Sequence, residues 1–490
     1  MITAETRSKY RTTIGIECHV QLKTKTKLFA AVGNDAREAP PNTLVSHICF
    51  GLPGALPFLN KEVIHLATRA AFALGAEPEH FSKFDRKHYF YPDLPNGYQI
   101  SQYDEPIIAK GSVKVEVDGQ PKEVGITRAH LEEDAGKNTH PAGADYSLVD
   151  LNRAGTPLLE IVSEPDMHSA AEAKAYAREL YLRMKYAGVS DADLYYGNMR
   201  FDVNVSISKT DTLGTRSETK NLNSFRSVEK AVEYEVKRQI ELLEQGKKVV
   251  QETRGWDDAK QRTFSQRSKE DADDYRYMPE PDIPPIVIEQ AYINKIKKEM
   301  PVMPDEWRKR LNSLGLDEAS IETLIEAEVE DGNAKYLDIL EEEMGNKDYA
   351  QFIANYFVNV QIPLCREIGY NNLKLFDSRL ILNGIFVLLQ AGKLNSTSAK
   401  ALFIEVFKSG DVPEDFENYA HDKGYIQVSD EGKITKIVEQ VIKDNPQAAT
   451  DVKNGEMKAI GFLVGQVMKV SKGQANPGLA QQFIKKQLGL

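Results

Sequence analysis

Val149-Asp-Leu-Asn-Arg-Ala-Gly-Thr-Pro-Leu-Leu-Glu160 brings turn-forming residues and a buried acid together within one short run. Gly155 and Pro157 are typical of a turn. Arg153 carries a fork that binds phosphate or carboxylate through two parallel hydrogen bonds. Glu160 stands in an apolar frame, so its carboxylate is half-buried and needs a partner. A metal ion is one such partner, and a salt bridge is the alternative.

A second run, Ile14–Leu22, alternates apolar and polar residues as a strand does. Glu17, His19 and Gln21 therefore share one face. A carboxylate and an imidazole two residues apart suit a divalent metal that takes mixed oxygen and nitrogen ligands. A surface strand with outward polar residues remains the alternative.

Three consecutive acids, Glu132-Glu-Asp134, occur within Ile126–Lys137. If this segment is a strand, Arg128, His130, Glu132 and Asp134 share a face. Carboxylates at contact distance repel each other unless a cation lies among them. Mg²⁺ takes one or two carboxylates plus waters and substrate phosphates. The pattern favours a magnesium site, with an acidic turn as the alternative.

Arg200–Ile207 alternates strictly over eight residues, which predicts a half-buried strand. Its polar face holds Arg200, Asp202, Asn204 and Ser206, and this face is either part of a site or an exposed sheet surface. Lys220, Asn221 and Asn223 follow just before a predicted helix, where donors near the helix N-terminus favour anions.

The texture of the chain predicts three domains. Residues 1–290 mix strand and helix patterns, and include a hairpin signal at Asp118-Gly119, a helix from Ser169 to about Gly188 and a helix from about Val228 to Leu243. Residues 291–410 are almost all helical, and residues 411–490 hold shorter, more basic helices. The predicted fold class is α+β.

The 490 residues carry a net charge of −11, but six lysines and one glutamate give the stretch from Lys453 a local charge of +5. That end suggests a polyanion contact, unless the lysines are only a solvated face. The apolar runs are too short for a membrane span, and no signal peptide is visible. Three widely spaced cysteines favour a reducing compartment, and we expect a cytoplasmic protein.

Together these segments resemble the B subunit of the tRNA-dependent glutamyl/aspartyl-tRNA amidotransferase. The resemblance runs along nearly the whole chain, and its motifs occur in the family's order. Besides the runs above, it includes Ser82–Asp93, Tyr98–Gln102, Asp274–Pro285, Gly461–Lys469 and Ser471–Pro477. It implies a cradle domain similar to glutamine synthetase and guanido kinases, then an all-α helical domain and a small all-α tail that contacts tRNA.

The resemblance also implies a reaction. ATP and Mg²⁺ would activate the side-chain carboxylate of Glu or Asp on a misacylated tRNA, and ammonia would then form the amide. By family likeness the metal positions are Glu17, His19, Glu132 or Glu133, and Glu160. Nucleotide or acyl-phosphate contacts would come from Arg153, Arg200, Asp202, Asn204, Lys220 and Asn223, with Arg153 and Lys220 as the nucleotide-binding pair.

Two departures from the family pattern change the expectation. Many members carry four zinc-binding cysteines, but those positions here are Ala30, Val32, Ser46 and Cys49. Structural zinc needs four ligands, so we predict no zinc. Gln21 replaces the usual glutamate and lowers the local negative charge by one.

The sequence contains no recognisable glutaminase or amidase motif. The resemblance implies that an amidase A subunit and a small C subunit supply the ammonia in a heterotrimer. Two rival hypotheses are a self-sufficient ammonia ligase and a non-catalytic tRNA-binding scaffold, and the scaffold would not need clustered Glu, His and Arg.

Overall fold

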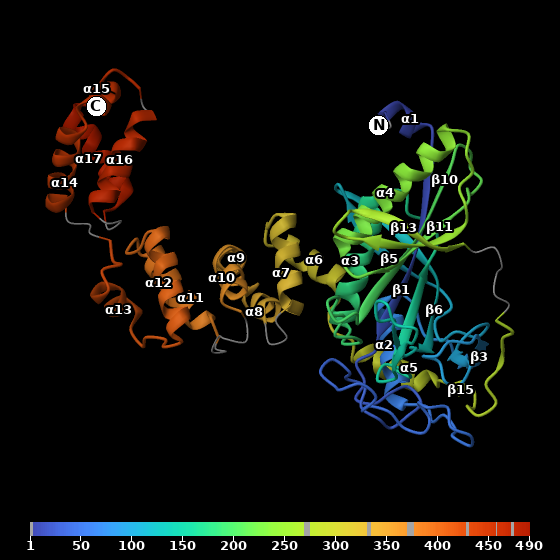
Figure 1. Ribbon diagram of the computed structural model, residues 1–490. Helices are drawn as coiled ribbons and strands as arrows, with labels where there is room; N and C mark the ends of the chain where they lie inside the picture. The colour runs from blue at the N-terminus through green and yellow to red at the C-terminus, as the bar shows by residue number, and fades with distance from the viewer. Residues whose placement is uncertain are drawn as a thin grey trace. The chain divides into compact units, whose positions relative to one another are not determined.

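The computed structural model describes residues 3–268, 275–330, 335–369, 377–427, 431–456, 458–471 and 475–490. Asp274 of the proline-rich motif and residues 472–474 of the C-terminal motif lie outside these ranges. The chain divides into two compact units, Met1–Pro304 and Asp305–Leu490 (Figure 1). Among the described residues, no helix is long and apolar enough to cross a membrane.

The first unit is built on a large, mainly antiparallel sheet with the path β13-β12-β11-β10-β1-β9-β6-β4-β3-β14, and β5 pairs with β6. Its strands are β1 (Arg11–Gln21), β3 (Asp85–His88), β4 (Tyr98–Ser101), β5 (Gly111–Val117), β6 (Gln120–Glu133), β9 (Pro157–Ser163), β10 (Met199–Ser208), β11 (Ser217–Leu222), β12 (Glu252–Asp257), β13 (Arg262–Ser268) and β14 (Met278–Pro279). Two small sheets pair β2 (Phe81–Ser82) with β15 (Ile286–Val287) and β7 (Lys137–Thr139) with β8 (Leu148–Asp150).

Strand β1 occupies the centre of this sheet, between β9 and β10, and its burial alternates along its length. Ile14, Ile16, Cys18 and Val20 are completely or almost completely buried. Because side chains on a strand alternate between faces, the polar residues of β1 lie on the opposite face. One sheet face therefore forms the core, and the other is free to carry polar side chains.

The apolar face packs against helices α3 (Ala170–Tyr186) and α4 (Phe225–Glu244), which also contact each other. Ser169 caps α3 by accepting from the Glu172 amide, as the sequence predicted. Helix α4 begins three residues earlier than expected, because Ser224 caps it. Shorter helices of this unit are α1 (Ala4–Ser8), α2 (Lys61–Ala73) and α5 (Gln290–Lys298).

Several local predictions are confirmed. The hairpin of β5 and β6 turns at Asp118 and Gly119, both with positive φ, as an Asp-Gly turn requires. The Arg200–Ile207 strand appears as β10. The first compact unit extends beyond residue 290, because Ile293 of α5 belongs to its hydrophobic core.

The regular elements of the second unit are all helices among its described residues. Its helices are α6 (Pro304–Asn312), α7 (Glu318–Glu330), α8 (Tyr336–Glu343), α9 (Lys347–Tyr356), the π-helical turn η1 (Phe357–Gln361), α10 (Ile362–Ile368), α11 (Arg379–Gln390), α12 (Ser396–Ser409), α13 (Phe416–Asp422), α14 (Glu431–Asp444), α15 (Pro446–Lys453), α16 (Lys458–Val470) and α17 (Pro477–Leu488). Buried residues from Ile434 to Leu488 form a core of their own.

A large sheet followed by helices confirms the predicted α+β class. The likeness to the glutamine synthetase and guanido kinase cradle stays a prediction, as does the three-domain division.

Candidate active site

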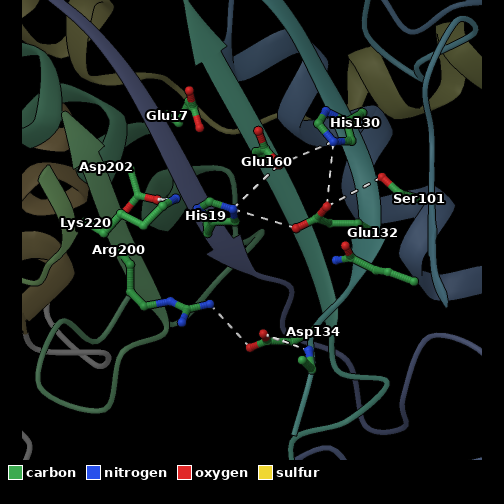
Figure 2. Close-up of polar contacts among 12 residues, drawn as sticks. Glu17, His19, Ser101, His130, Glu132, Asp134, Glu160, Arg200, Asp202 and Lys220 are labelled. Carbon is green, nitrogen blue, oxygen red and sulfur yellow. Dashed lines mark hydrogen bonds and ion pairs between the residues drawn. The ribbon is translucent and has the colours of Figure 1, made fainter. Parts of the chain in front are cut away.

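The first cluster on the polar face joins three adjacent strands. His19 of β1 pairs across the ladder with Glu160 of β9, which in turn pairs with His130 of β6. The His19 Nε2 atom lies 3.6 Å from Glu160 Oε2 and 3.7 Å from Glu132 Oε1. His130 Nε2 lies 3.4 Å from Glu160 Oε2 and 3.8 Å from Glu132 Oε2. Figure 2 shows these four side chains converging. We call His19, Glu132 and Glu160 the imidazole cluster.

A second cluster lies further along the same sheet face. Glu17 of β1 pairs with Asp202 of β10, and Glu218 comes from the next strand, β11. Each of these three carboxylates offers an oxygen within 4.8 Å of the others. We call Glu17, Asp202 and Glu218 the carboxylate cluster. Lys220 Nζ lies 2.8 Å from Asp202 and 3.1 Å from Glu218, so one ammonium already balances part of this charge.

The protonation states reflect the crowding of charge. Burial favours a neutral imidazole, but the Glu160 and Glu132 carboxylates outweigh it and raise the pKa of His19 to about 9. Burial also opposes ionisation of Glu160, but the charges of His130 and His19 lower its pKa below the usual range. Burial, followed by the charge of Glu160, raises the pKa of Glu17. The polar face therefore carries excess negative charge that attracts cations.

The residues of both clusters fit a divalent cation. Each cluster presents three ligand atoms close enough to share one ion, and oxygen-rich sets suit Mg²⁺ or Mn²⁺. Asn204 Nδ2 donates to Glu17 at 3.1 Å, yet Asn204 Oδ1 is buried and has no donor among the described residues. An unpaired buried oxygen beside three carboxylates is the kind of acceptor that a cation satisfies.

Two arginines meet at Asp134, just beyond the end of β6. Arg153 Nε lies 3.2 Å and Arg200 Nη2 lies 3.4 Å from Asp134 Oδ2. Arg153 also donates to the carbonyl groups of Ala135 and Gly136 at 3.0 and 2.8 Å. Part of the Arg153 guanidinium therefore stabilises the turn after β6. The Arg153 side chain is still 42% exposed.

Glu133 and Asn223 of the sequence-based candidate set take no part in either cluster or in the contacts described around them. Glu133 projects from β6 on the side opposite Glu132, and its Oε1 accepts from the Ile100 amide at 3.0 Å. Burial raises the pKa of Glu133 to about 7. Asn223 is exposed and precedes the Ser224 cap of α4. The geometry thus joins Glu132, and not Glu133, to His19 and Glu160.

Three further residues enter the site although sequence reasoning did not select them. His130 and Glu218 share strand faces with Glu132 and Lys220, which were chosen, and that alternation is the signal that could have found them. Lys87 of β3 lies in the Ser82–Asp93 segment of the resemblance, where nothing distinguished it from its neighbours. Burial disfavours its ammonium, but the charge of Glu132 outweighs this effect and raises the pKa of Lys87. Its Nζ lies 4.8 Å from the centroid of the Tyr275 ring.

Two clefts flank the clusters along β1. One has a volume of about 530 Å³ and is lined by Glu17 and Asn204, together with Arg216 and Gln251. The other has a volume of about 510 Å³ and begins at Gln21, beyond the imidazole cluster. Both volumes suit a small ligand or a single nucleotide.

The region where family members carry zinc cysteines is built differently here. Cys49 is buried, its Sγ lies 3.5 Å from Lys27 Nζ, and Ser46 Oγ is 3.6 Å away. Lys27 also donates to the Leu151 carbonyl at 3.2 Å. An ammonium therefore contacts the only thiol at these four positions. The prediction of no zinc stays a prediction.

Comparison with known proteins identifies the family. A family model described as the GatB/GatE catalytic domain matches residues 12–294, and one described as the GatB domain matches residues 338–488. The aspartyl/glutamyl-tRNA(Asn/Gln) amidotransferase B subunit of Carboxydothermus hydrogenoformans is 43% identical over 486 residues, which are 98% of this chain and 99% of that protein. The proteins of the same name from Thermotoga sp. (strain RQ2) and Thermoanaerobacter pseudethanolicus are 43% and 44% identical, each over 98% of this chain and 99% of their own length. This chain therefore belongs to the family of aspartyl/glutamyl-tRNA(Asn/Gln) amidotransferase B subunits.

Proposed function

We propose that this chain is the activating subunit of the amidotransferase. It would use ATP to convert the side-chain carboxylate of Glu or Asp on a misacylated tRNA into an acyl phosphate. A carboxylate oxygen forms a bond to the γ-phosphorus as its bond to ADP breaks. Ammonia then attacks the acyl carbon, phosphate leaves, and the amide remains after loss of a proton. The observation that carries this proposal is the pair of clusters on one sheet face.

The clusters offer what phosphoryl transfer needs. His19, Glu132 and Glu160 would hold one divalent cation, and Glu17, Asp202 and Glu218 would hold another. Bound Mg²⁺ would neutralise the phosphate oxygens and the charge that develops during transfer. The buried residues keep both ligand sets fixed on rigid strands, which preserves their geometry.

Cationic side chains of this chain would stabilise the remaining negative charge. Lys220 is held at the carboxylate cluster by Asp202 and Glu218. Arg200 extends from β10 beside His19 of β1, and Asp134 orients it. Both lie on the sheet face where the transferred phosphoryl group would be stabilised. Arg153 is the third candidate, through the part of its fork that is not bound to carbonyl groups.

The cleft beside Glu17 is our candidate for ATP. It is lined by Glu17 and Asn204, so a triphosphate in it would reach the carboxylate cluster directly. Arg216 adds a cation to its wall, and Thr215 and Gln251 add hydrogen-bonding groups. Magnesium bound to a nucleotide normally bridges its phosphates and protein carboxylates. This cleft is therefore better placed for ATP than the one beyond Gln21.

The ammonia would come from partner subunits. The relatives are named as B subunits, and the sequence of this chain shows no amidase motif. We propose an assembly with an amidase A subunit and a small C subunit, which release ammonia from glutamine. The nature of the reaction assigns the complex to the carbon–nitrogen ligases.

The test is Glu160→Gln in the assembled complex, with ammonium chloride as the nitrogen donor so that glutamine hydrolysis is bypassed. The substitution removes one charge from the imidazole cluster and keeps the side-chain shape. We expect ATP consumption that depends on misacylated tRNA to fall at least about 10- to 100-fold. Phosphate release and amide formation would be measured on the same samples.

Glu116→Gln is the matched control, because Glu116 is exposed on β5 of the same sheet. It should leave ATP consumption unchanged. Binding of misacylated tRNA should survive in both variants. Full ATP-dependent activity in Glu160→Gln would refute the activating role of the cluster and favour the non-catalytic scaffold.

A further inference from the structure

The cleft beyond Gln21 carries features that the activation chemistry does not explain. It is lined by residues of the β1 end, the Asp35–Arg37 loop, the Asp150–Arg153 run and the segment from Asp191 to Asn198. None of the six residues of the two clusters lines it. The proposed metal ions would therefore not contact a ligand in this cleft. Any charge on such a ligand must be balanced by side chains that line the cleft.

Two exposed tyrosines form one wall of this cleft. Tyr195 is 86% exposed and Tyr196 is 49% exposed, and their rings meet edge to face at 5.1 Å between centroids. The Asp193 carboxylate accepts from both of their amides, at 2.9 and 3.2 Å, and fixes the turn that presents them. Removing an aromatic ring from water is favourable. An exposed tyrosine ring can therefore stack with a flat ring of a ligand.

Cations surround the same wall. The guanidinium of Arg37 lies 5.6 Å from the Tyr196 ring centroid, while Asp35 fixes its fork. Lys137 lines the cleft and is exposed, and within the described part of the chain it has no acidic partner. Lys23 and Arg153 also line the cleft, and they pair with Asp191 at 2.9 Å and with Asp134 at 3.2 Å. Gln21 is neutral at the floor, where a glutamate would have added negative charge. This arrangement favours a phosphate-bearing ligand.

Unpaired acceptors give a second, independent indication of a ligand. Asn34 and Asn198 line the cleft and are 4% and 8% exposed. Their amide nitrogens donate, to Thr24 Oγ1 at 3.2 Å and to Gln21 Oε1 at 2.9 Å. Their Oδ1 atoms are buried and have no donor among the described residues. Buried oxygens without donors are uncommon in folded proteins, and a ligand that carries amino or hydroxyl groups would satisfy them.

We propose that this cleft binds the 3′-terminal nucleotide of the acceptor strand of the tRNA, with its base stacked on Tyr195, whose ring Tyr196 supports edge to face. The assignment rests on the proposed function, because it gives the second substrate its own place beside the imidazole cluster. Lys137 and Arg37 meet the backbone phosphates of the single-stranded end, and Asn34 and Asn198 accept from the base or ribose. Stacking tolerates any base, while the unpaired acceptors favour one with donor groups.

The test compares binding of deacylated tRNA with binding of the same tRNA lacking its 3′-terminal nucleotide, using the full complex without ATP. The wild-type complex should bind the intact tRNA about 5- to 150-fold more tightly, the range for stacking of one base on an aromatic residue. The double variant Tyr195→Ala/Tyr196→Ala should lose this difference. Tyr195→Phe/Tyr196→Phe keeps both rings and should retain it.

Tyr146→Ala is the matched control, because Tyr146 is 59% exposed and does not line the cleft. In turnover assays, the alanine double variant should raise the KM for misacylated tRNA and leave the KM for ATP unchanged. A raised KM for ATP with unchanged tRNA binding would overturn the proposal and assign the cleft to ATP. Equal binding of both tRNAs by the wild-type complex would also overturn it.

This result is separable from the proposed function. The comparison of the two tRNAs measures binding alone, so it supports or overturns the assignment of the cleft whether or not ATP is consumed. Failure of the wild-type complex to consume ATP with misacylated tRNA would instead refute the activating role.

Discussion

His19 Nε2 lies 3.6 Å from Glu160 Oε2, across the antiparallel pairing of β1 with β9. These two residues are 141 positions apart in the chain. Glu160 stands among apolar residues in the sequence, so its half-buried carboxylate needs a partner. His19 is one such partner. Substitution of either residue removes one of the other's two close partners, because Glu160 also contacts His130 and His19 also contacts Glu132.

The two adjacent acids of β6 should behave differently. Glu132→Gln removes a charge from the imidazole cluster, so we expect a loss of ATP-dependent activation of about 10- to 100-fold. Glu133→Gln keeps an oxygen that accepts from the Ile100 amide, so we expect activity within about twofold of wild type, as for a substitution that removes no contact. Both variants would be assayed for phosphate release with misacylated tRNA. Equal losses in the two variants would contradict the separation of their faces.

Divalent cations should stabilise the protein against unfolding, independently of activity. A ligand that binds only the folded state at 100 times its Kd adds about 2.7 kcal/mol to the free energy of unfolding. We expect Mg²⁺ or Mn²⁺ to raise the Tm of the wild-type protein and a chelator to reverse the rise. The combined variant Glu160→Gln/Asp202→Asn has one ligand removed from each cluster and should show little rise. Glu116→Gln serves again as the control, and a wild-type Tm that does not respond to cation would count against both sites.

The sequence predicted which side chains share one face of a single strand. It did not predict which strands pair with one another in the sheet. Alternation along Arg200–Ile207 correctly placed Arg200, Asp202 and Asn204 on one side, because side chains on a strand alternate whatever lies beside it. The pairing of β1 with both β9 and β10 is set by contacts between distant segments. No local pattern records those contacts, so the division into two clusters appeared only in the structure.

The ambiguity between Glu132 and Glu133 shows the same limit. The sequence did not reveal where β6 ends, and the strand continues through Glu133. Once that is known, the alternation that begins at His130 selects Glu132. Asn223 lies just before the Ser224 cap of α4, where the sequence predicted it, and its contact with a nucleotide or acyl phosphate stays a prediction.

Acid should destabilise the first unit through Glu235 of α4. This carboxylate is fully buried and accepts from Ser217 Oγ at 2.6 Å, and Arg238 and Arg254 lie 2.7 and 3.0 Å away. Burial opposes its ionisation, but the Arg238 hydrogen bond and charge outweigh burial and lower the pKa of Glu235. A carboxyl group whose pKa is lower in the folded state stabilises the fold above its unfolded pKa of about 4.3. That stabilisation disappears as the pH falls through the lowered pKa.

Glu235→Gln should therefore reduce the free energy of unfolding at pH 7 by about 3 to 5 kcal/mol, the cost of breaking a buried ion pair. The difference between variant and wild type should shrink as the pH falls below about 4.3. Denaturant unfolding at several pH values measures both effects. Glu241→Gln on the same helix is the control, because that side chain is 45% exposed. A difference that stays constant with pH would rule out the proposed linkage.

The basic C-terminal end should contribute to tRNA binding, and the structure sharpens where to remove it. A cut at residue 411 would strip α13, whose Phe416 packs closely against Gly384 of α11. The backbone amide of Gln427 also donates to the Lys393 carbonyl at 2.8 Å. A deletion of residues 428–490 spares these contacts and removes the separate core that spans Ile434–Leu488.

We expect this deletion to weaken tRNA binding and to make its salt dependence shallower, since each lysine–phosphate contact contributes about −0.7 to −0.9 to the slope of log K against log salt. Lys469→Gln/Lys486→Gln should reproduce part of the loss with the tail in place, and Lys114→Gln/Lys298→Gln should not. Ammonia-dependent activation at saturating misacylated tRNA should survive the deletion, because both clusters lie in the first unit. Unchanged tRNA affinity after the deletion would show that the lysines are only a solvated face.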